Sequence, residues 1–343
     1  MLPLKIEQTN LLRLARDYAA RQAAARPSLR CAVLTGSVAR GEPPLGDAVD
    51  LDILMVDDSV VAPQAELARL SDFVFVDALI VPPSAYADRK AVRVHHHTSP
   101  LINNALLLYD PRHYFDILQA SVRAPYSRAD HIYARARSAQ AAAVAAYEPL
   151  AAYCEDPAPE PLPIDLLMAL HDSLYLSACA VVLLMAQPDS TGPRKMMVRF
   201  EGAARQLRSE LYGRFLGAMG VAGLSPAEVE PLFADWLTQY KAASKRGTAN
   251  PLIHPLKRGY YERGIRALIA EGHAINTLWL MEHTFAACVR DLSPFPAEWT
   301  QFLQTTGKAS GAEFSRRVQE TEAFLALVDE TLVNWAKRES VEW

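Results

Sequence analysis

Cysteine is scarce in this chain, with only four among 343 residues: Cys31, Cys154, Cys179 and Cys288. They lie far apart and form no Cys-x-x-Cys pair, so the sequence predicts neither a structural zinc site nor a disulfide framework. Cys31 and Cys179 lie in apolar runs, where a free cysteine behaves as a small buried hydrophobe. This usage is typical of a protein in a reducing cytoplasm.

Long hydrophobic runs are also missing. The longest nearly apolar stretch, residues 174–186, contains Ser177 and is shorter than the roughly 20 apolar residues that cross a bilayer. Residues 1–5 do not lead from a charged segment into an apolar one, so we expect no signal peptide. The sequence therefore predicts a cytoplasmic protein with no membrane partner, and a buried helix over this stretch.

The chain has no excess of positive charge, since 35 Lys and Arg face 39 Asp and Glu for a net charge of -4. Proteins that bind duplex DNA or tRNA over a broad surface usually carry a basic field, so we expect no nucleic-acid partner. A local basic pocket remains compatible with this balance. The length suits two domains, and 50% hydrophobic residues are ordinary for a globular protein.

The most informative stretch begins with an apolar run, residues 31–34, which predicts a strand ending at Gly36-Ser37. After a loop rich in proline and glycine, a second apolar run contains Asp50 and Asp52. Because these acids are two positions apart on a predicted strand, both side chains point to one face, with Cα atoms about 6.6 Å apart. The sequence therefore predicts two neighbouring carboxylates close to a glycine turn.

This arrangement is typical of a site for a metal ion and a phosphate. Two carboxylates on one face of an apolar strand repel each other and lose hydration, and a divalent cation relieves both effects. Mg²⁺ binds one or two carboxylates together with substrate phosphates, and backbone N–H groups at Gly36 and Ser37 suit a phosphate. A third carboxylate would complete a two-ion site. Asp77, the acid in the later strand-like run 73–81, is our candidate, although a carboxylate at a strand end or turn is the alternative.

The combination of Gly36-Ser37, a loop and Asp50-Leu51-Asp52 resembles the nucleotidyltransferase superfamily that includes DNA polymerase beta and the aminoglycoside nucleotidyltransferases. Ala39-Arg40-Gly41 after the turn also resembles the family. Val49 stands where many members have serine, but this position is not a ligand. The resemblance covers residues 30–115, which is about a third of the chain.

The resemblance implies an α+β protein with an N-terminal nucleotidyltransferase catalytic domain over residues 1–123, built on a small mixed sheet flanked by helices. An all-α helical-bundle domain over residues 124–343 would bind the acceptor. The predicted order of elements agrees, since strands end near residue 110 and helices follow. A short helix is predicted over residues 63–70, because proline suits a first helical turn. Some relatives place the active site between two subunits, so a homodimer is one arrangement that the resemblance allows.

The reaction that the resemblance implies moves a nucleoside monophosphate, with AMP from ATP as the commonest case, onto a hydroxyl of a small-molecule acceptor and releases pyrophosphate. Asp50 and Asp52 would bridge two Mg²⁺ ions, and Asp77 would hold the ion nearest the acceptor. Gly36 and Ser37 would hold a phosphate of the nucleoside triphosphate. An aminoglycoside-like antibiotic is a candidate acceptor. The alternatives are adenylylation of a protein or RNA, and a nucleotide-binding sensor without transfer activity.

Further residues are candidates for the same site. Arg40 either reaches the triphosphate or is a solvated loop arginine. Arg194 and Lys195 resemble a lysine of some adenylyltransferases that assists with the triphosphate, and a basic helix face in water is the alternative. Asp172, on a predicted apolar helix, is the candidate general base, because a desolvated acid has a raised pKa suited to accepting a proton. The triplet His95-His96-His97 predicts a polar turn, since adjacent residues do not converge on one ion.

Overall fold

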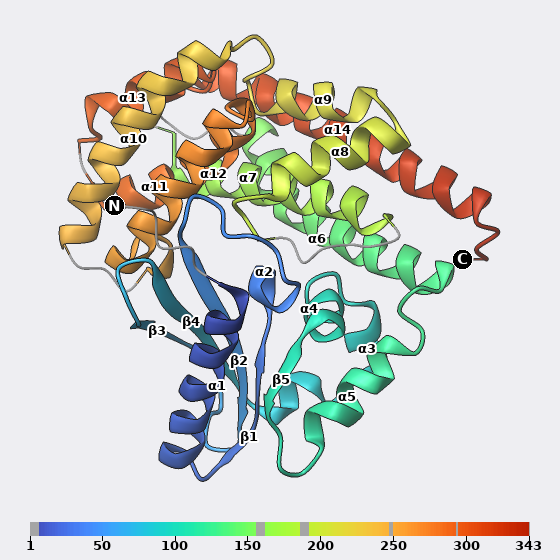
Figure 1. Cartoon of the computed structure of the whole chain (residues 1–343). Helices are drawn as coiled ribbons and strands as arrows, with labels where there is room; N and C mark the ends of the chain where they lie inside the picture. The colour runs from blue at the N-terminus through green and yellow to red at the C-terminus, as the bar shows by residue number, and fades with distance from the viewer. Residues whose placement is uncertain (1–6, 156–161, 186–191, 247–249, 293, 343) are drawn as a thin grey trace.

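The structure is a computed structural model that describes residues 7–155, 162–185, 192–246, 250–292 and 294–342 (Figure 1). The strands lie in the N-terminal third and helices make up the rest, so the α+β prediction is confirmed. The strands are β1 (Leu29–Leu34), β2 (Val49–Asp57), β3 (Gln64–Arg69), β4 (Val74–Val81) and β5 (Leu106–Tyr109). The helices are α1 (Gln8–Ala25), α2 (Gly36–Ala39), α3 (Arg89–Val94), α4 (Thr98–Asn104), α5 (Tyr114–Arg123), α6 (Ala129–Glu155), α7 (Ile164–Leu183), α8 (Met196–Leu207), α9 (Glu210–Ala218), α10 (Pro226–Arg246), α11 (Pro255–Ala270), α12 (Leu278–Val289), α13 (Ala297–Thr305) and α14 (Gly311–Arg338).

The sheet is mixed, with strand order β3-β4-β2-β1-β5. The central pair, β2 and β4, runs parallel, and the other pairs run antiparallel. The helix predicted over residues 63–70 is wrong, because residues 64–69 form the edge strand β3 against β4. An edge strand faces solvent along much of its length, so its polar residues give no clear apolar alternation.

Helices cover both faces of the sheet (Figure 1). Side chains alternate along a strand, so Ile53 packs in the layer under α1 while Leu54 packs in the layer formed with α3, α4 and α5. Asp50 and Asp52 share the face of Leu54, as the two-residue period requires. Asp50 and Asp52 lie closer to the start of β2 than Leu54 does. At that end of the strand this face of the sheet borders the cavity described below.

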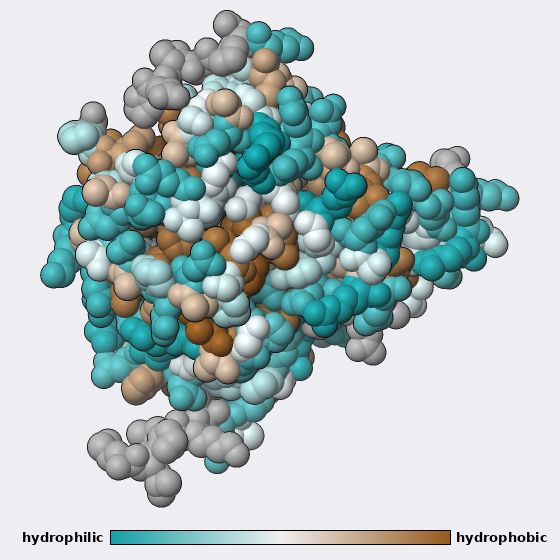
Figure 2. All heavy atoms as spheres, turned by 90° about the horizontal axis from the view of Figure 1, so that it is seen from above, coloured by the Kyte–Doolittle hydropathy of each residue, from teal (hydrophilic) through white to brown (hydrophobic). Residues whose placement is uncertain are grey.

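The helical region is built around α7, which packs chiefly against α6 and also against α8, α12 and α14. By length and composition α7 is the one helix in the described chain that would suit a membrane span, but 67% of its apolar window is buried inside the protein. It is therefore the core helix of this region, as predicted. From above, the helical half has a largely hydrophilic surface with hydrophobic residues gathered near the centre of the view (Figure 2).

The sheet and the helical region pack tightly against each other along α11. Phe75 of β4 meets Tyr260 of α11 edge to face, with ring centroids 5.5 Å apart. Gly46 has a φ of +65°, and a side chain there would overlap the backbone carbonyl of Arg263. The predicted division at residue 124 falls between α5, which ends at Arg123, and α6, which begins at Ala129.

Candidate active site

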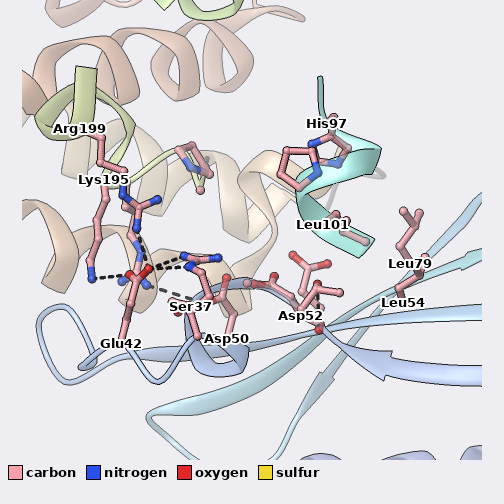
Figure 3. Close-up of a pocket in the computed structure, with 18 of the residues that line it drawn as sticks. Ser37, Glu42, Asp50, Asp52, Leu54, Leu79, His97, Leu101, Lys195 and Arg199 are labelled. Atoms are coloured by element: carbon pink, nitrogen blue, oxygen red, sulfur yellow. Dashed lines mark hydrogen bonds and ion pairs between the residues drawn. The ribbon is translucent and has the colours of Figure 1, made fainter. Parts of the chain in front are cut away.

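A cavity of about 640 Å³ lies between the sheet and the helical region. Residues of the α2 turn, β2, β4, α4 and α7 line it, together with residues just before α8. This volume lies within the range of pockets that hold a small molecule or a nucleotide. Figure 3 shows that charged side chains gather at one end of the cavity and apolar ones at the other, with Asp52 between them.

The three predicted carboxylates lie together on one wall of this cavity. Asp52 of β2 pairs in register with Asp77 of the parallel strand β4, and Asp50 pairs with Phe75. Neighbouring strands are about 4.8 Å apart, so Asp52 and Asp77 are side by side. Asp50, Asp52 and Asp77 all line the cavity. The structure therefore brings together three acids that the sequence places on two separate strands.

The Gly36-Ser37 turn lies directly against Asp52. Gly36 has a φ of +70°, and a Cβ atom on it would overlap Oδ2 of Asp52. The backbone N–H of Thr35 donates to the Asp52 carbonyl at 2.8 Å, which fixes the turn to β2. Gly36 and Ser37 line the cavity beside the carboxylates, as predicted.

Asp52 is the least compensated of the three acids. Burial raises the pKa of its carboxyl well above the ordinary value, and the charges of Asp50 and Asp77 raise it further. In the described part of the chain Asp52 makes no ion pair. A cation placed here would relieve the repulsion and would favour the ionised form.

The other two carboxylates have cationic partners from the helical region. Nζ of Lys257 lies 2.6 Å from Oδ2 of Asp77. Nη2 of Arg194 lies 3.8 Å from Oδ1 of Asp50, and this buried guanidinium lies over the ring of Tyr260 with Cζ 3.3 Å from its centroid. Arg194 was predicted as a triphosphate ligand, and the structure places it against Asp50. Lys257 was missed, because nothing in the sequence separates it from the other basic residues nearby.

A second group of charges lies at one end of the cavity (Figure 3). The carboxylate of Glu42 accepts from Arg40 at 2.6 Å, from Arg199 at 2.8 Å and from Lys195 at 3.1 Å. Burial disfavours the ionised Glu42, but Arg199 and Arg40 outweigh this effect and hold its pKa below the ordinary value. Arg40, Lys195 and Arg199 are called the basic cluster below. The prediction named Arg40 and Lys195 and missed Arg199 and Glu42.

The opposite end of the cavity is apolar. Leu54, Leu79 and Leu101 line it, with His97 above them (Figure 3). Desolvation lowers the pKa of His97 below its ordinary value, and the neighbouring His95 lowers it further. His95, His96 and His97 form the turn that leads into α4, so the polar turn predicted there is observed.

The predicted general base, Asp172, lies outside this arrangement. It is exposed on α7, and it is not among the described residues that line the cavity. Desolvation raises the pKa of its carboxyl, as expected for an acid on an apolar helix, and none of the three site aspartates contributes to this shift. The structure therefore brings together every predicted site residue except Asp172.

The three carboxylates supply suitable ligand atoms for a divalent cation, but they are not already arranged around one ion position. They offer the oxygen ligands that Mg²⁺ prefers, and Asp52 lacks a counter-charge. In the described ranges, however, no group of three His, Cys, Asp or Glu residues is close enough to hold a metal ion as it stands. Asp50 and Asp52 beside a bound phosphate therefore fit an ion better than all three acids do.

No family model matches this chain, and no curated protein matches it. Among solved structures, the chain is similar to the crystal structure of a nucleotidyltransferase-like protein from Exiguobacterium sibiricum 255-15. The two share 12% identity over 76% of this chain and 92% of that chain, with a TM-score of 0.29. With so distant a likeness, the case for a function rests on the side chains described above.

Proposed function

We propose that this protein is a metal-dependent nucleotidyltransferase that moves a nucleoside monophosphate, AMP from ATP, onto a hydroxyl of a small molecule. One observation carries the proposal: Asp50, Asp52 and Asp77 face one cavity from two parallel strands, beside Gly36-Ser37 and next to the basic cluster. A site of this kind combines a place for a metal ion with a place for a polyphosphate.

The basic cluster supports binding of the triphosphate. Arginine and lysine are the usual partners of phosphate groups, and Arg40, Lys195 and Arg199 already converge on one anion, Glu42. Ser37 lies at the same end of the cavity (Figure 3). In this proposal the β- and γ-phosphates lie at this end, and the cluster offsets the negative charge of the pyrophosphate as it leaves.

Asp50 and Asp52 would hold Mg²⁺ together with the phosphates. When bound, the ion supplies charge stabilisation at the reacting phosphate and helps to activate the attacking hydroxyl. The contribution of the chain itself is positional. The hydrogen bond from the Thr35 N–H to the Asp52 carbonyl holds the Gly36-Ser37 turn against the carboxylates. A nucleotide bound at this turn would have its α-phosphate close to the acids.

The apolar end supports an acceptor with an uncharged, apolar surface. Leu54, Leu79 and Leu101 would pack against it and exclude water from the reacting hydroxyl. The acids among the described lining residues are Glu42, in the basic cluster, and the three aspartates. A polycationic, aminoglycoside-like acceptor would meet few further anions, so a neutral hydroxyl compound fits this wall better. We also propose a cytoplasmic setting, which rests on the small number and wide spacing of the cysteines in the sequence.

Pyrophosphate release tests the proposal. The protein would be incubated with ATP, Mg²⁺ and a panel of neutral and cationic hydroxyl compounds, and the products would be weighed by mass spectrometry. We expect a nucleotide adduct that is lost in Asp52→Asn and retained in Asp58→Asn. Asp58 is an exposed acid just after the far end of β2, and it pairs with Arg30. Failure of ATP to bind in calorimetry, with Mg²⁺ present, would contradict the proposal without reference to any acceptor.

A further inference from the structure

A lysine of the helical region, Lys257, forms an ion pair with Asp77, one of the three carboxylates. The Nζ atom of Lys257 lies 2.6 Å from Oδ2 of Asp77, and the side chains are only 14% and 26% exposed. Salt screens a shielded pair of this kind much less than it screens a surface pair. Lys257 is not among the described residues that line the cavity, so it approaches Asp77 from the side of α11.

The position of Lys257 is set by the packing of α11. One turn further along this helix, Tyr260 packs edge to face on Phe75, which is two residues before Asp77 on β4. The carbonyl of Arg263 leaves no room for a side chain on Gly46. These contacts hold the first turns of α11 against the sheet, so the ammonium group of Lys257 is a fixed charge beside Asp77.

The charges around the three acids leave room for one ion. Lys257 pairs with Asp77, and the buried Arg194 lies 3.8 Å from Asp50. Counting formal charges, the acids and these two cations retain an excess of one negative charge. Before a nucleotide binds, a single divalent ion more than offsets this charge, and Lys257 already supplies at Asp77 the positive charge that a second ion would bring.

We propose that the ammonium of Lys257 takes the place of the ion that Asp77 would otherwise hold, so that the site takes a single divalent ion on Asp50 and Asp52. This inference rests on the proposed function, and it replaces the expectation of two Mg²⁺ ions. Asp77 becomes a positioning residue whose carboxylate is paired with the ammonium of Lys257. The pairing of Lys257 with Asp77 also accounts for the finding that the described acids do not form a three-ligand metal cluster.

The test counts bound ions directly. Mn²⁺ would be titrated into the protein in the presence of α,β-methylene-ATP, which cannot be cleaved, and followed by electron paramagnetic resonance. We expect one bound Mn²⁺ per chain with no spin coupling. Lys257→Met should bind two, and their spectra should be broadened by coupling, because the ions of two-metal sites lie about 3.5–4 Å apart. Arg266→Met is the matched control: it removes a positive charge from the same helix, α11, that pairs with Glu262 instead of the aspartates, and it should still bind one ion.

Two coupled ions on the unchanged protein would overturn the inference and leave the proposed function intact. A count of one in a folded Lys257→Met, checked by circular dichroism, would also overturn it. Should that variant fail to fold, the count on the unchanged protein decides by itself. Absence of any bound Mn²⁺ in the presence of the nucleotide would contradict both this inference and the metal-dependent function.

Discussion

Gly36 and Asp52 are in direct contact, so closely that any side chain on Gly36 would overlap the Asp52 carboxylate. We therefore expect Gly36→Ala to displace that carboxylate and to abolish ATP binding in calorimetry. The substitution also forces alanine to a φ of +70°, a conformation that costs about 1–3 kcal/mol. Urea unfolding would measure this loss of stability.

Gly41→Ala is the matched control for this substitution. Gly41 has a φ of +72°, and no atom lies within 4 Å of the place where its Cβ would be. It should therefore show the conformational loss of stability and keep ATP binding. If both variants lose ATP binding equally, contact with Asp52 is not the cause.

Replacing Asp52 by asparagine should stabilise the metal-free protein above about pH 4, the range in which an unperturbed aspartate ionises. Burial, and then Asp50 and Asp77, raise the pKa of Asp52 in the fold. An acid with a higher pKa in the folded chain binds its proton more tightly there, so stability is lost as the pH rises through that pKa. We expect thermal unfolding in EDTA to show a Tm higher by a few degrees for Asp52→Asn at pH 8, with a smaller difference at pH 5.

Mg²⁺ with α,β-methylene-ATP should remove this advantage by stabilising only the unchanged protein. A metal-free Asp52→Asn that is less stable than the unchanged protein at pH 8 would show that Asp52 makes a favourable contact instead of an unfavourable one. Asp58→Asn, an exposed acid, should have little effect on either measurement.

Glu42→Gln should lower stability and strengthen the response to polyphosphate. Glu42 is the common anion of Arg40, Lys195 and Arg199, and removing its charge leaves these groups to repel one another. Loss of a charged hydrogen-bond partner in a shielded site costs about 1–3 kcal/mol. Inorganic tripolyphosphate should therefore raise the Tm of the variant more than that of the unchanged protein.

Glu330→Gln provides the comparison for this experiment. Glu330 pairs with Arg208 at 2.7 Å, but its side chain is 58% exposed, and surface pairs contribute about 0–1 kcal/mol. Its response to tripolyphosphate should equal that of the unchanged protein. An equal response from Glu42→Gln would mean that the basic cluster does not bind polyphosphate.

Leu79→Glu should weaken binding of the acceptor and leave binding of the nucleotide unchanged. Leu79 lies at the apolar end of the cavity and is 39% exposed, so the fold should tolerate a polar side chain there. A carboxylate at this position would have to be desolvated by an apolar acceptor, and we expect KM for a neutral acceptor to rise at least about tenfold. ATP affinity in calorimetry should change little.

The control for Leu79 is another half-exposed leucine on a strand. Leu107 of β5 is 41% exposed and is not among the described residues that line the cavity. Leu107→Glu should leave both constants unchanged. If the two substitutions change the KM for the acceptor equally, the acceptor does not bind at the apolar end of the cavity.

The sequence predicted the parts of the site that depend on local order. Asp50 and Asp52 share a face because a strand has a period of two. Gly36-Ser37 lies beside them because it directly follows β1, which pairs antiparallel with β2. Lys257, Glu42 and Arg199 were missed, because only tertiary packing brings α8 and α11 to residues far away in the sequence. For example, Arg199 and Glu42 are 157 positions apart.

Tertiary packing also explains why the sequence misplaced Asp172 and predicted a helix in place of β3. Asp172 lies on α7, which is buried over much of its circumference, so the sequence pattern did not indicate which side of the helix faces the cavity. The edge strand β3 was predicted as a helix, because its pairing with β4 leaves no apolar signature in residues 64–69. Neighbouring elements decided both cases, and a single sequence does not show them.

The in-register pairing of β2 with β4 ties the chemistry of this protein to its core. A slip of one residue along β2 would turn Asp50 and Asp52 into the layer under α1 and would present Leu51 and Ile53 to the cavity. Such a chain would lose its fold together with its acids. The proposed activity would therefore be lost in evolution by substitution of single aspartates, while the alternation along the strand would persist.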